Sequence, residues 1–184
     1  LRWRVIGLQK EISKRLVAVL EEHDIDPYSV CDLLKAFEAD SMFSPFYTWS
    51  DLMNYCSYSA NPVGRFLLAT AGLNVKIPDM DKAEFTELSD KICTGLQLIN
   101  FAQDIKEDAE NNRCYIPKCE WPESLKENNM TSVLKLAVEN KNKLVMKLAA
   151  KGEQSLLSGS HLPKKIRKSN LRYAARFSME IALI

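Results

Sequence analysis

Four polar residues recur at helical spacing in the middle of the chain: Gln97, Asn100, Asp104 and Asp108. At 100° per residue they would occupy one stripe about 80° wide along a helix. Large apolar residues border this stripe on both sides, including Phe101. An ordinary amphipathic helix turns its polar stripe to water and its apolar stripe inward. An amide-rich stripe between large apolar residues instead indicates the wall of a polar site inside a helical protein.

The two aspartates in this stripe suggest a metal. Asp104 and Asp108 are one turn apart, so their charges should repel, and they lie toward the C-terminal end of the expected helix, where the helix dipole disfavours anions. Mg²⁺ would explain them, because it takes one or two carboxylates together with waters and phosphate oxygens. A solvated acidic helix end is the alternative, since Glu107 and Glu110 lie beside them. The spacing alone leaves both interpretations open.

The elements that must position these residues are all expected to be helices. Apolar residues recur at helical spacing, and no stretch of useful length alternates as a strand does. A Thr-x-x-Asp capping box is expected to begin a helix at Thr48, which Pro62 should kink. The other predicted helices cover residues 3–22, a segment that begins at Asp26-Pro27, residues 81–110, residues 131–157 and the end of the chain. We therefore predict an all-α fold.

Composition limits the class of protein. The 184 residues suffice for one domain, 46% are hydrophobic and 27% are charged, and the net charge of +1 argues against a nucleic-acid binder. The two histidines are far apart in sequence, which disfavours a histidine metal site or triad. The five cysteines include no C-x-x-C pair, which favours free thiols in a reducing compartment. The chain starts at Leu1 without a methionine and has no apolar run long enough to span a bilayer, so we expect a cytoplasmic fragment of a longer protein.

Positive charge is concentrated near the C-terminus. Residues 141–184 contain ten Lys or Arg against two Glu. A basic face could contact an anionic membrane surface, here the inner face of the cytoplasmic membrane. A solvated basic surface is the simpler interpretation and is favoured.

Two blocks of the sequence resemble the squalene/phytoene synthase family. Residues 97–117 are similar to that family's second aspartate-rich motif, a Q-x-x-N-x-x-x-D-x-x-x-D helix followed by R-x-Y-x-P. Residues 55–65, with Tyr-Cys and then Ser-Ala-Asn-Pro-Val-Gly-Arg, are similar to its Y-C…V-G helix. The Ser-Ala-Asn-Pro-Val-Gly-Arg sequence at 59–65 looks most like the bacterial hydroxysqualene synthase branch. So does Gln103, where arginine is more usual in the family. The resemblance runs from about Leu33 to the C-terminus.

The resemblance implies a fold and an activity. The fold would be the isoprenoid synthase helical bundle, with residues 1–184 forming a single domain that corresponds to the C-terminal two-thirds of the family domain. The activity would be Mg²⁺-dependent ionisation of a prenyl diphosphate, farnesyl or presqualene diphosphate, with hydroxysqualene as the product and no need for NADPH. The implied roles are metal binding by Asp104 and Asp108, catalysis by Tyr55, Arg113 and Tyr115, and substrate binding by Ser59, Arg65, Gln97, Asn100, Phe101 and Gln103.

One family motif is missing from this chain. The first aspartate-rich motif, D-D-x-x-D, has no match in residues 1–60, where Asp40 and Asp51 stand alone. We expect it upstream of Leu1. A squalene or phytoene synthase that joins two prenyl diphosphates remains an alternative, as does a non-catalytic assembly factor with the synthase fold.

Overall fold

A computed structural model describes residues 2–70, 82–125, 130–140, 143–166 and 169–182. Every regular element in these ranges is a helix, as the sequence predicts. The elements in chain order are α1 (Arg2–Glu22), α2 (Tyr28–Ser41), α3 (Trp49–Ser59), α4 (Asn61–Thr70), α5 (Lys82–Gln103), α6 (Ile105–Glu110), α7 (Met130–Asn140), α8 (Lys143–Gly159), α9 (Leu162–Lys165) and α10 (Ser169–Ala182), with 3₁₀ turns at Lys118–Glu120 and Glu123–Leu125. The predicted connection at residues 72–80 lies outside the described residues.

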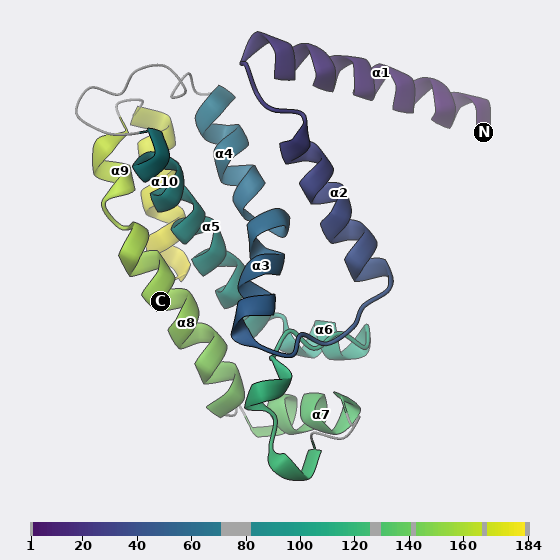
Figure 1. The fold of residues 1–184 in the computed structure, drawn as a ribbon, viewed down its shortest axis with the longest axis vertical. Coiled ribbons are helices and arrows are strands. Elements are labelled where there is room, and N and C mark those ends of the chain that lie inside the picture. Colours follow the sequence, from purple (N-terminus) through teal and green to yellow (C-terminus); the bar gives the residue numbers. More distant parts are fainter. Residues whose placement is uncertain (1, 71–81, 126–129, 141–142, 167–168, 183–184) are drawn as a thin grey trace.

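Helix α5 is the centre of the bundle, and α8 packs along one side of it in the antiparallel direction (Figure 1). Their backbones approach closely at Gly95 and Gly152. A methyl group at Gly95 would lie only 2.8 Å from the carbonyl oxygen of Gly152. Because even alanine would collide with backbone there, the two glycines fix how the two helices lie against each other.

Helices α3 and α4 cover one side of α5, and α2 lies against both of them (Figure 1). The capping box predicted at Thr48 begins α3: the Asp51 N–H donates to Thr48 Oγ1 at 3.2 Å, and the Thr48 N–H donates to Asp51 Oδ2 at 2.8 Å. The predicted kink is a break, because α3 ends at Ser59 and α4 starts at Asn61, directly before Pro62. The chain therefore changes direction between α3 and α4, while both helices remain packed on α5.

The lower end of the bundle in Figure 1 brings together segments that are far apart in sequence. The loop between α2 and α3 pairs with the segment after α6 through two backbone hydrogen bonds. Lys118 N–H donates to Phe46 O at 2.8 Å, and Cys119 N–H donates to Tyr47 O at 3.0 Å. The Trp121 indole N–H donates to Ile116 O at 2.8 Å and holds the following turn. These bonds fix the position of the R-x-Y-x-P segment, residues 113–117.

The helix predicted at 131–157 is wrong as a single element. The structure has α7 and α8 there, with α7 packed on α6 and α8 packed on α5.

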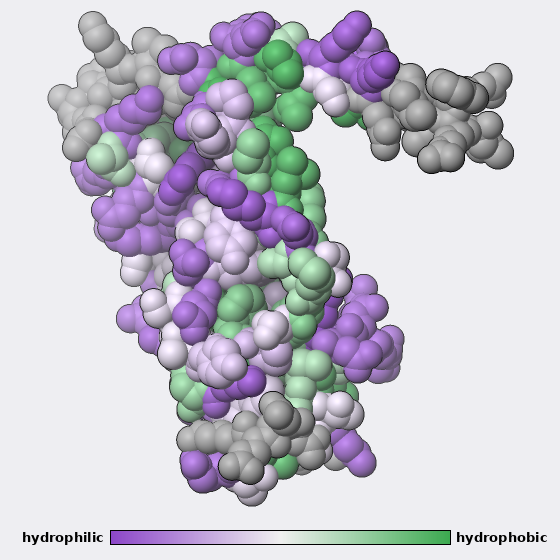
Figure 2. All heavy atoms as spheres, turned by 45° about the vertical axis from the view of Figure 1, so that its right-hand side comes forward, coloured by the Kyte–Doolittle hydropathy of each residue, from purple (hydrophilic) through white to green (hydrophobic). Residues whose placement is uncertain are grey.

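At the other end of the molecule α1 projects away from the bundle, and hydrophobic atoms lie at the surface beneath it (Figure 2). On α2 the side chains of Leu34 and Phe37 are largely exposed. The largest buried cluster combines side chains of α3, α5, α7 and α8 with the segment after α6.

Candidate active site

The acidic pair lies where the central helix is interrupted. Helix α5 ends at Gln103, and Asp104 has φ −89° and ψ 10° before α6 begins at Ile105. The hydrogen bonds still follow the helical pattern, with Asp104 N–H to Asn100 O and Asp108 N–H to Asp104 O, both 2.8 Å. The two carboxylates consequently remain one turn apart. The prediction of an uninterrupted helix over 81–110 is wrong at this residue.

The interruption also corrects the expected dipole effect. Asp108 belongs to the first turn of α6, whose N-terminal N–H groups favour negative charge, rather than to the last turns of a long helix. Mutual repulsion and burial are then the main reasons why the pair is unfavourable as two bare anions.

Asp108 carries a poorly compensated charge. Its side chain is half-buried, and this burial raises its pKa from the ordinary 3.8 to about 6. The charge of Asp104 raises the pKa further, and the guanidinium of Arg113 opposes both effects. Arg113 is placed there by the backbone, because its N–H donates to Asp108 O at 2.8 Å. A cation bound between the two carboxylates would relieve this repulsion.

The amide-bearing residues before the acidic pair lie along α5. Gln97 is half-buried, whereas Asn100 and Gln103 are exposed. Their apolar neighbours Leu98 and Phe101 are buried, as the spacing predicts. The sequence prediction that the four stripe residues face one cavity stays a prediction.

A sealed aromatic cluster lies directly beside the acidic pair. The rings of Phe101 and Tyr115 stack with centroids 3.9 Å apart and planes 6° apart. Tyr55 contacts both, at centroid distances of 6.3 Å to Phe101 and 5.9 Å to Tyr115. Phe46, from the paired loop, packs on both tyrosines. Tyr55, Phe101 and Tyr115 are each no more than 4% exposed. Three of the predicted site residues, from α3, α5 and the segment after α6, thus form one contact cluster.

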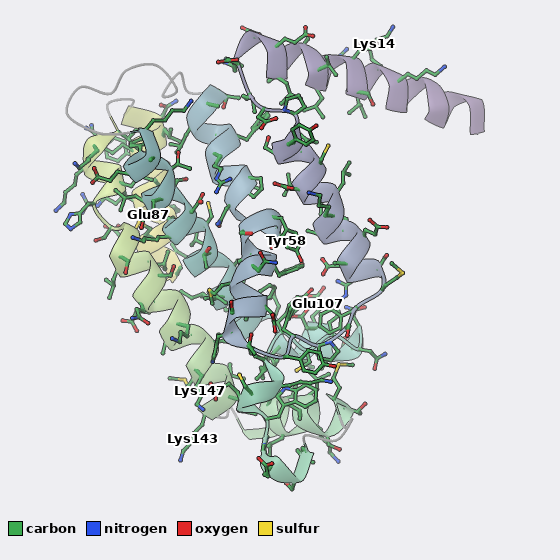
Figure 3. All side chains as sticks on the ribbon, viewed as in Figure 1. Lys14, Tyr58, Glu87, Glu107, Lys143 and Lys147 are labelled. Atoms are coloured by element: carbon green, nitrogen blue, oxygen red, sulfur yellow. The ribbon has the colours of Figure 1, made fainter. Side chains whose placement is uncertain are left out.

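Figure 3 marks the two sides of this region. Tyr58 on α3 packs edge-on against Tyr55 with centroids 5.4 Å apart, and Glu107 projects from α6. The aromatic cluster and the acidic residues of α6 therefore lie in the same region of the bundle.

Asp40 is a site residue that the sequence reasoning missed. It lies in the last turn of α2, and its carboxylate accepts hydrogen bonds from the hydroxyls of Tyr55 (2.8 and 2.9 Å) and Tyr115 (3.1 Å). Arg113 Nη2 donates a long bond of 3.4 Å to its backbone carbonyl. The available signal was an aspartate at a helix C-terminus, where the dipole disfavours it. That signal was too weak to reveal partners 15 and 75 residues away.

The last two predicted substrate-binding residues differ in what they contact. The Ser59 hydroxyl is buried and has no hydrogen-bond partner within the described part of the chain. Arg65 is already engaged: its guanidinium forms a two-pronged pair with Asp90 of α5, in which Nε lies 2.9 Å from Oδ1 and Nη2 contacts Oδ2. A role of Ser59 and Arg65 in substrate binding stays a prediction, and for Arg65 the structure shows a structural contact instead.

The donor chemistry fits magnesium better than a transition metal. Over the described ranges no three His, Cys, Asp or Glu side chains are arranged to hold a metal ion. Asp104 and Asp108 offer two carboxylates, which is the number Mg²⁺ commonly takes when waters and phosphate oxygens complete its shell. Burial and the charge of Asp104 raise the pKa of Asp108, and the guanidinium of Arg113 offsets this rise only in part. These two residues are therefore the ones that could hold Mg²⁺.

The family model for squalene/phytoene synthase matches residues 6–183. The chain belongs to the squalene/phytoene synthase family. Among its relatives, the hydroxysqualene synthase of Sinorhizobium fredii (strain NBRC 101917 / NGR234) is 32% identical over 168 residues, which is 91% of this chain and 54% of that protein. The hydroxysqualene synthase of Zymomonas mobilis subsp. mobilis is 40% identical over 87 residues, which cover 47% of this chain and 27% of the relative.

Other members of the family are also similar. The 15-cis-phytoene synthase of Enterobacter agglomerans is 35% identical over 95 residues, 52% of this chain and 30% of that protein. The crystal structure of squalene synthase HpnC from Alicyclobacillus acidocaldarius superposes with a TM-score of 0.72 at 24% identity, covering 89% of this chain and 59% of that one. The isoprenoid synthase fold is therefore confirmed. This family member spans about half the length, or less, of the relatives that it matches.

Proposed function

We propose that this squalene/phytoene synthase family chain is part of a Mg²⁺-dependent enzyme that ionises presqualene diphosphate and yields hydroxysqualene. The observation that carries the proposal is the pairing of two half-buried carboxylates, Asp104 and Asp108, with a sealed aromatic cluster next to them. One region suits a metal-bound diphosphate. The other suits the hydrocarbon cation that remains when diphosphate leaves.

At the acidic end the residues bind and orient the diphosphate. Asp104 and Asp108 would hold Mg²⁺, which when bound supplies Lewis-acid stabilisation of the departing group. Arg113 offers a guanidinium suited to two-pronged contact with phosphate oxygens. Gln97 and Asn100 present amides on the same helix for the diphosphate and its waters, and Gln103 supplies a further amide that can hold a water.

At the aromatic end the residues exclude water and stabilise positive charge. The ring faces of Phe101, Tyr55 and Tyr115 carry negative electrostatic potential, which attracts a cation. Their burial keeps bulk water from quenching the cation early. Ser59, one turn beyond Tyr55 on α3, has a buried hydroxyl without a partner among the described residues, and it could bond to a substrate or water.

The hydroxysqualene product is favoured by two sequence features. Residues 59–65 and Gln103 depart from the more usual squalene synthase pattern, and the relatives of Sinorhizobium and Zymomonas are hydroxysqualene synthases. Water would capture the cation, so NADPH would not be consumed. A squalene or phytoene synthase is the second candidate, supported by the similarity to phytoene synthases. A non-catalytic assembly factor is less well supported, because the chain retains Asp104 and Asp108.

The deciding experiment supplies the full-length protein with presqualene diphosphate and Mg²⁺, with and without NADPH, and identifies the C30 product. Hydroxysqualene formed without NADPH is the expected result. Squalene that appears only with NADPH, or phytoene from geranylgeranyl diphosphate, would replace the proposed reaction by the second candidate. No product from any of these substrates would favour the assembly factor.

We also propose that the protein is cytoplasmic and contacts the inner face of the membrane through basic residues of α8. Lys143, Lys147 and Lys151 recur every fourth residue; Lys143 and Lys147 project from its lower end in Figure 3, and Lys147 pairs with Glu120. None of the described helices is long and apolar enough to cross a bilayer. Co-sedimentation with anionic but not neutral vesicles is expected, and equal binding to both would contradict the proposal.

A further inference from the structure

Two phenol protons converge on one carboxylate at the border of the aromatic cluster. Tyr55 donates to both oxygens of Asp40, at 2.8 and 2.9 Å, and Tyr115 donates to Oδ1 at 3.1 Å. These three residues come from α3, α2 and the segment after α6, so the arrangement is a tertiary contact and no accident of local sequence. A tyrosine hydroxyl has a single proton. With that proton committed to Asp40, each phenol oxygen can only accept from any other partner.

The carboxylate of Asp40 has no ion-pair partner in the described part of the chain. Asp40 takes part in none of the ion pairs there, and Arg113 reaches only its backbone carbonyl. Hydrogen bonds to an ionised acceptor are stronger than neutral ones and draw the phenol proton toward the carboxylate. The phenol oxygens thereby become more electron-rich. Burial and Asp40 both raise the pKa of Tyr55 and Tyr115, so both stay neutral donors.

Asp40 does not belong to the metal-binding pair in this geometry. No group of three or more carboxylate, thiol or imidazole side chains is poised for a metal in the ranges that the structure describes. Its carboxylate oxygens face the two hydroxyls instead. A role through the tyrosines is therefore the one that its contacts support.

We infer that Asp40 is a positioning residue that holds the hydroxyls of Tyr55 and Tyr115 as donors to itself and leaves their oxygen lone pairs for the positive charge of the hydrocarbon. The inference rests on the proposed function, because it assigns the aromatic cluster to a cationic intermediate. It adds a fixed electrostatic element to the ring faces. Diphosphate and metal binding should not depend on it.

The test uses full-length protein and two probes that mimic the cation and its neutral counterpart. Farnesyldimethylamine, protonated at neutral pH, carries positive charge near the position of the carbocation, and farnesyl methyl ether has a similar shape without charge. The measured quantity is the ratio of their affinities in the presence of Mg²⁺ and inorganic pyrophosphate. Asp40→Asn is expected to lower the preference for the ammonium about tenfold, the size of one charge-assisted hydrogen bond.

A double-mutant cycle separates positioning from a general structural effect. In a Tyr55→Phe/Tyr115→Phe background, Asp40→Asn should change the preference no further, because the groups that Asp40 orients are gone. An equal loss in both backgrounds would overturn the inference. Asp32→Asn is the matched control, since it removes the same charge from the same helix, where the partly buried Asp32 forms its ion pair with Lys35. If Asp40→Asn does not fold, the single Tyr55→Phe and Tyr115→Phe variants still apply, and an unchanged preference in both would contradict the inference.

Pyrophosphate affinity distinguishes this inference from the proposed function. Mg²⁺-dependent binding of pyrophosphate should be the same in wild type and Asp40→Asn. Its absence in wild type would refute the proposed function, whereas its loss only in Asp40→Asn would make Asp40 a metal ligand and overturn the inference. Wild type that binds Mg²⁺-pyrophosphate but shows no preference for the ammonium would overturn the inference and leave the metal site intact.

Discussion

The acidic end and the aromatic cluster are neighbours in sequence and opposites in environment. Phe101 is almost fully buried and stacked on Tyr115, whereas Asp104, three residues later, is half-buried at a helix break. The acidic end has charge that Arg113 compensates only in part, and the tyrosine hydroxyls of the cluster donate to Asp40. The contrast teaches that one half is prepared for a ligand that brings positive charge. The other half already has its hydroxyl groups oriented within the protein.

The largest expected effect is the loss of metal-dependent binding at the acidic end. Asp104→Asn and Asp108→Asn should each weaken Mg²⁺-dependent pyrophosphate binding by the full-length protein at least about 100-fold, because each removes a charged ligand. Calorimetric titration measures it. Glu107→Gln is the matched control, since it removes a nearby exposed charge on α6 and should change the affinity little. Undiminished binding in both aspartate variants would place the metal elsewhere.

Substitutions in the aromatic cluster are expected to lower the stability of the fold, because these side chains are packed in the core. Tyr115→Ala should lower the free energy of unfolding by about 3–5 kcal/mol, as large aromatic truncations in a core do. Tyr115→Phe keeps the ring and removes one hydrogen bond to an ionised acceptor, so it should cost about 1.5–3 kcal/mol. Urea denaturation of the full-length protein gives both values. If Tyr115→Ala is no worse than Tyr115→Phe, the stacking on Phe101 contributes little to stability.

Asp108 should make stability depend on pH with a definite sign. Its folded-state pKa of about 6 is above the unfolded value of 3.8, so between these values the folded state binds the proton more tightly. Stability should therefore fall as pH rises through this window. Without Mg²⁺, Asp108→Asn should raise the melting temperature by a few degrees above pH 6 and have no such effect below about pH 4.

Mg²⁺ provides the control for this pH effect. Saturating Mg²⁺ should raise the melting temperature of wild type above pH 6 and leave Asp108→Asn unchanged, because binding to the folded state stabilises it. A stabilisation by Asp108→Asn that is equal at pH 4 and pH 8 would show that its charge is not the cause.

The smallest effect is expected at Arg65, outside both regions. Its exposed pair with Asp90 should contribute about 0.5–1 kcal/mol, so Arg65→Ala should destabilise only slightly. Because the guanidinium is already bound to Asp90, Mg²⁺-dependent pyrophosphate affinity should change by less than about threefold. A loss of tenfold or more would instead assign Arg65 to the substrate.

Much of the fold and part of the candidate site could be predicted from patterns among residues that are close together in the sequence. Helical spacing identified α1, α3 and α5, and the Thr-x-x-Asp pattern located the start of α3 at Thr48. The one-turn separation of Asp104 and Asp108 survives the helix break, because the backbone hydrogen bonds continue through it. Each of these features depends on residues within about four positions of each other.

The features that sequence reasoning missed are non-local. Asp40 finds its partners only when α2, α3 and the segment after α6 meet, and Arg65 finds Asp90 only when α4 packs on α5. The division of residues 131–157 into α7 and α8 follows from two different packing partners, α6 and α5. Periodicity cannot report such contacts, since it describes one helix at a time.

The close contact of Gly95 with Gly152 determines which part of this protein can move. A helix pair held apart by side chains can slide as rotamers change, but backbone against backbone has no such freedom. We therefore expect the amides of α5 and α8 to be the slowest in the chain to exchange with deuterium. Any closure around a ligand would then come from elements outside the α5–α8 pair, which acts as the fixed reference.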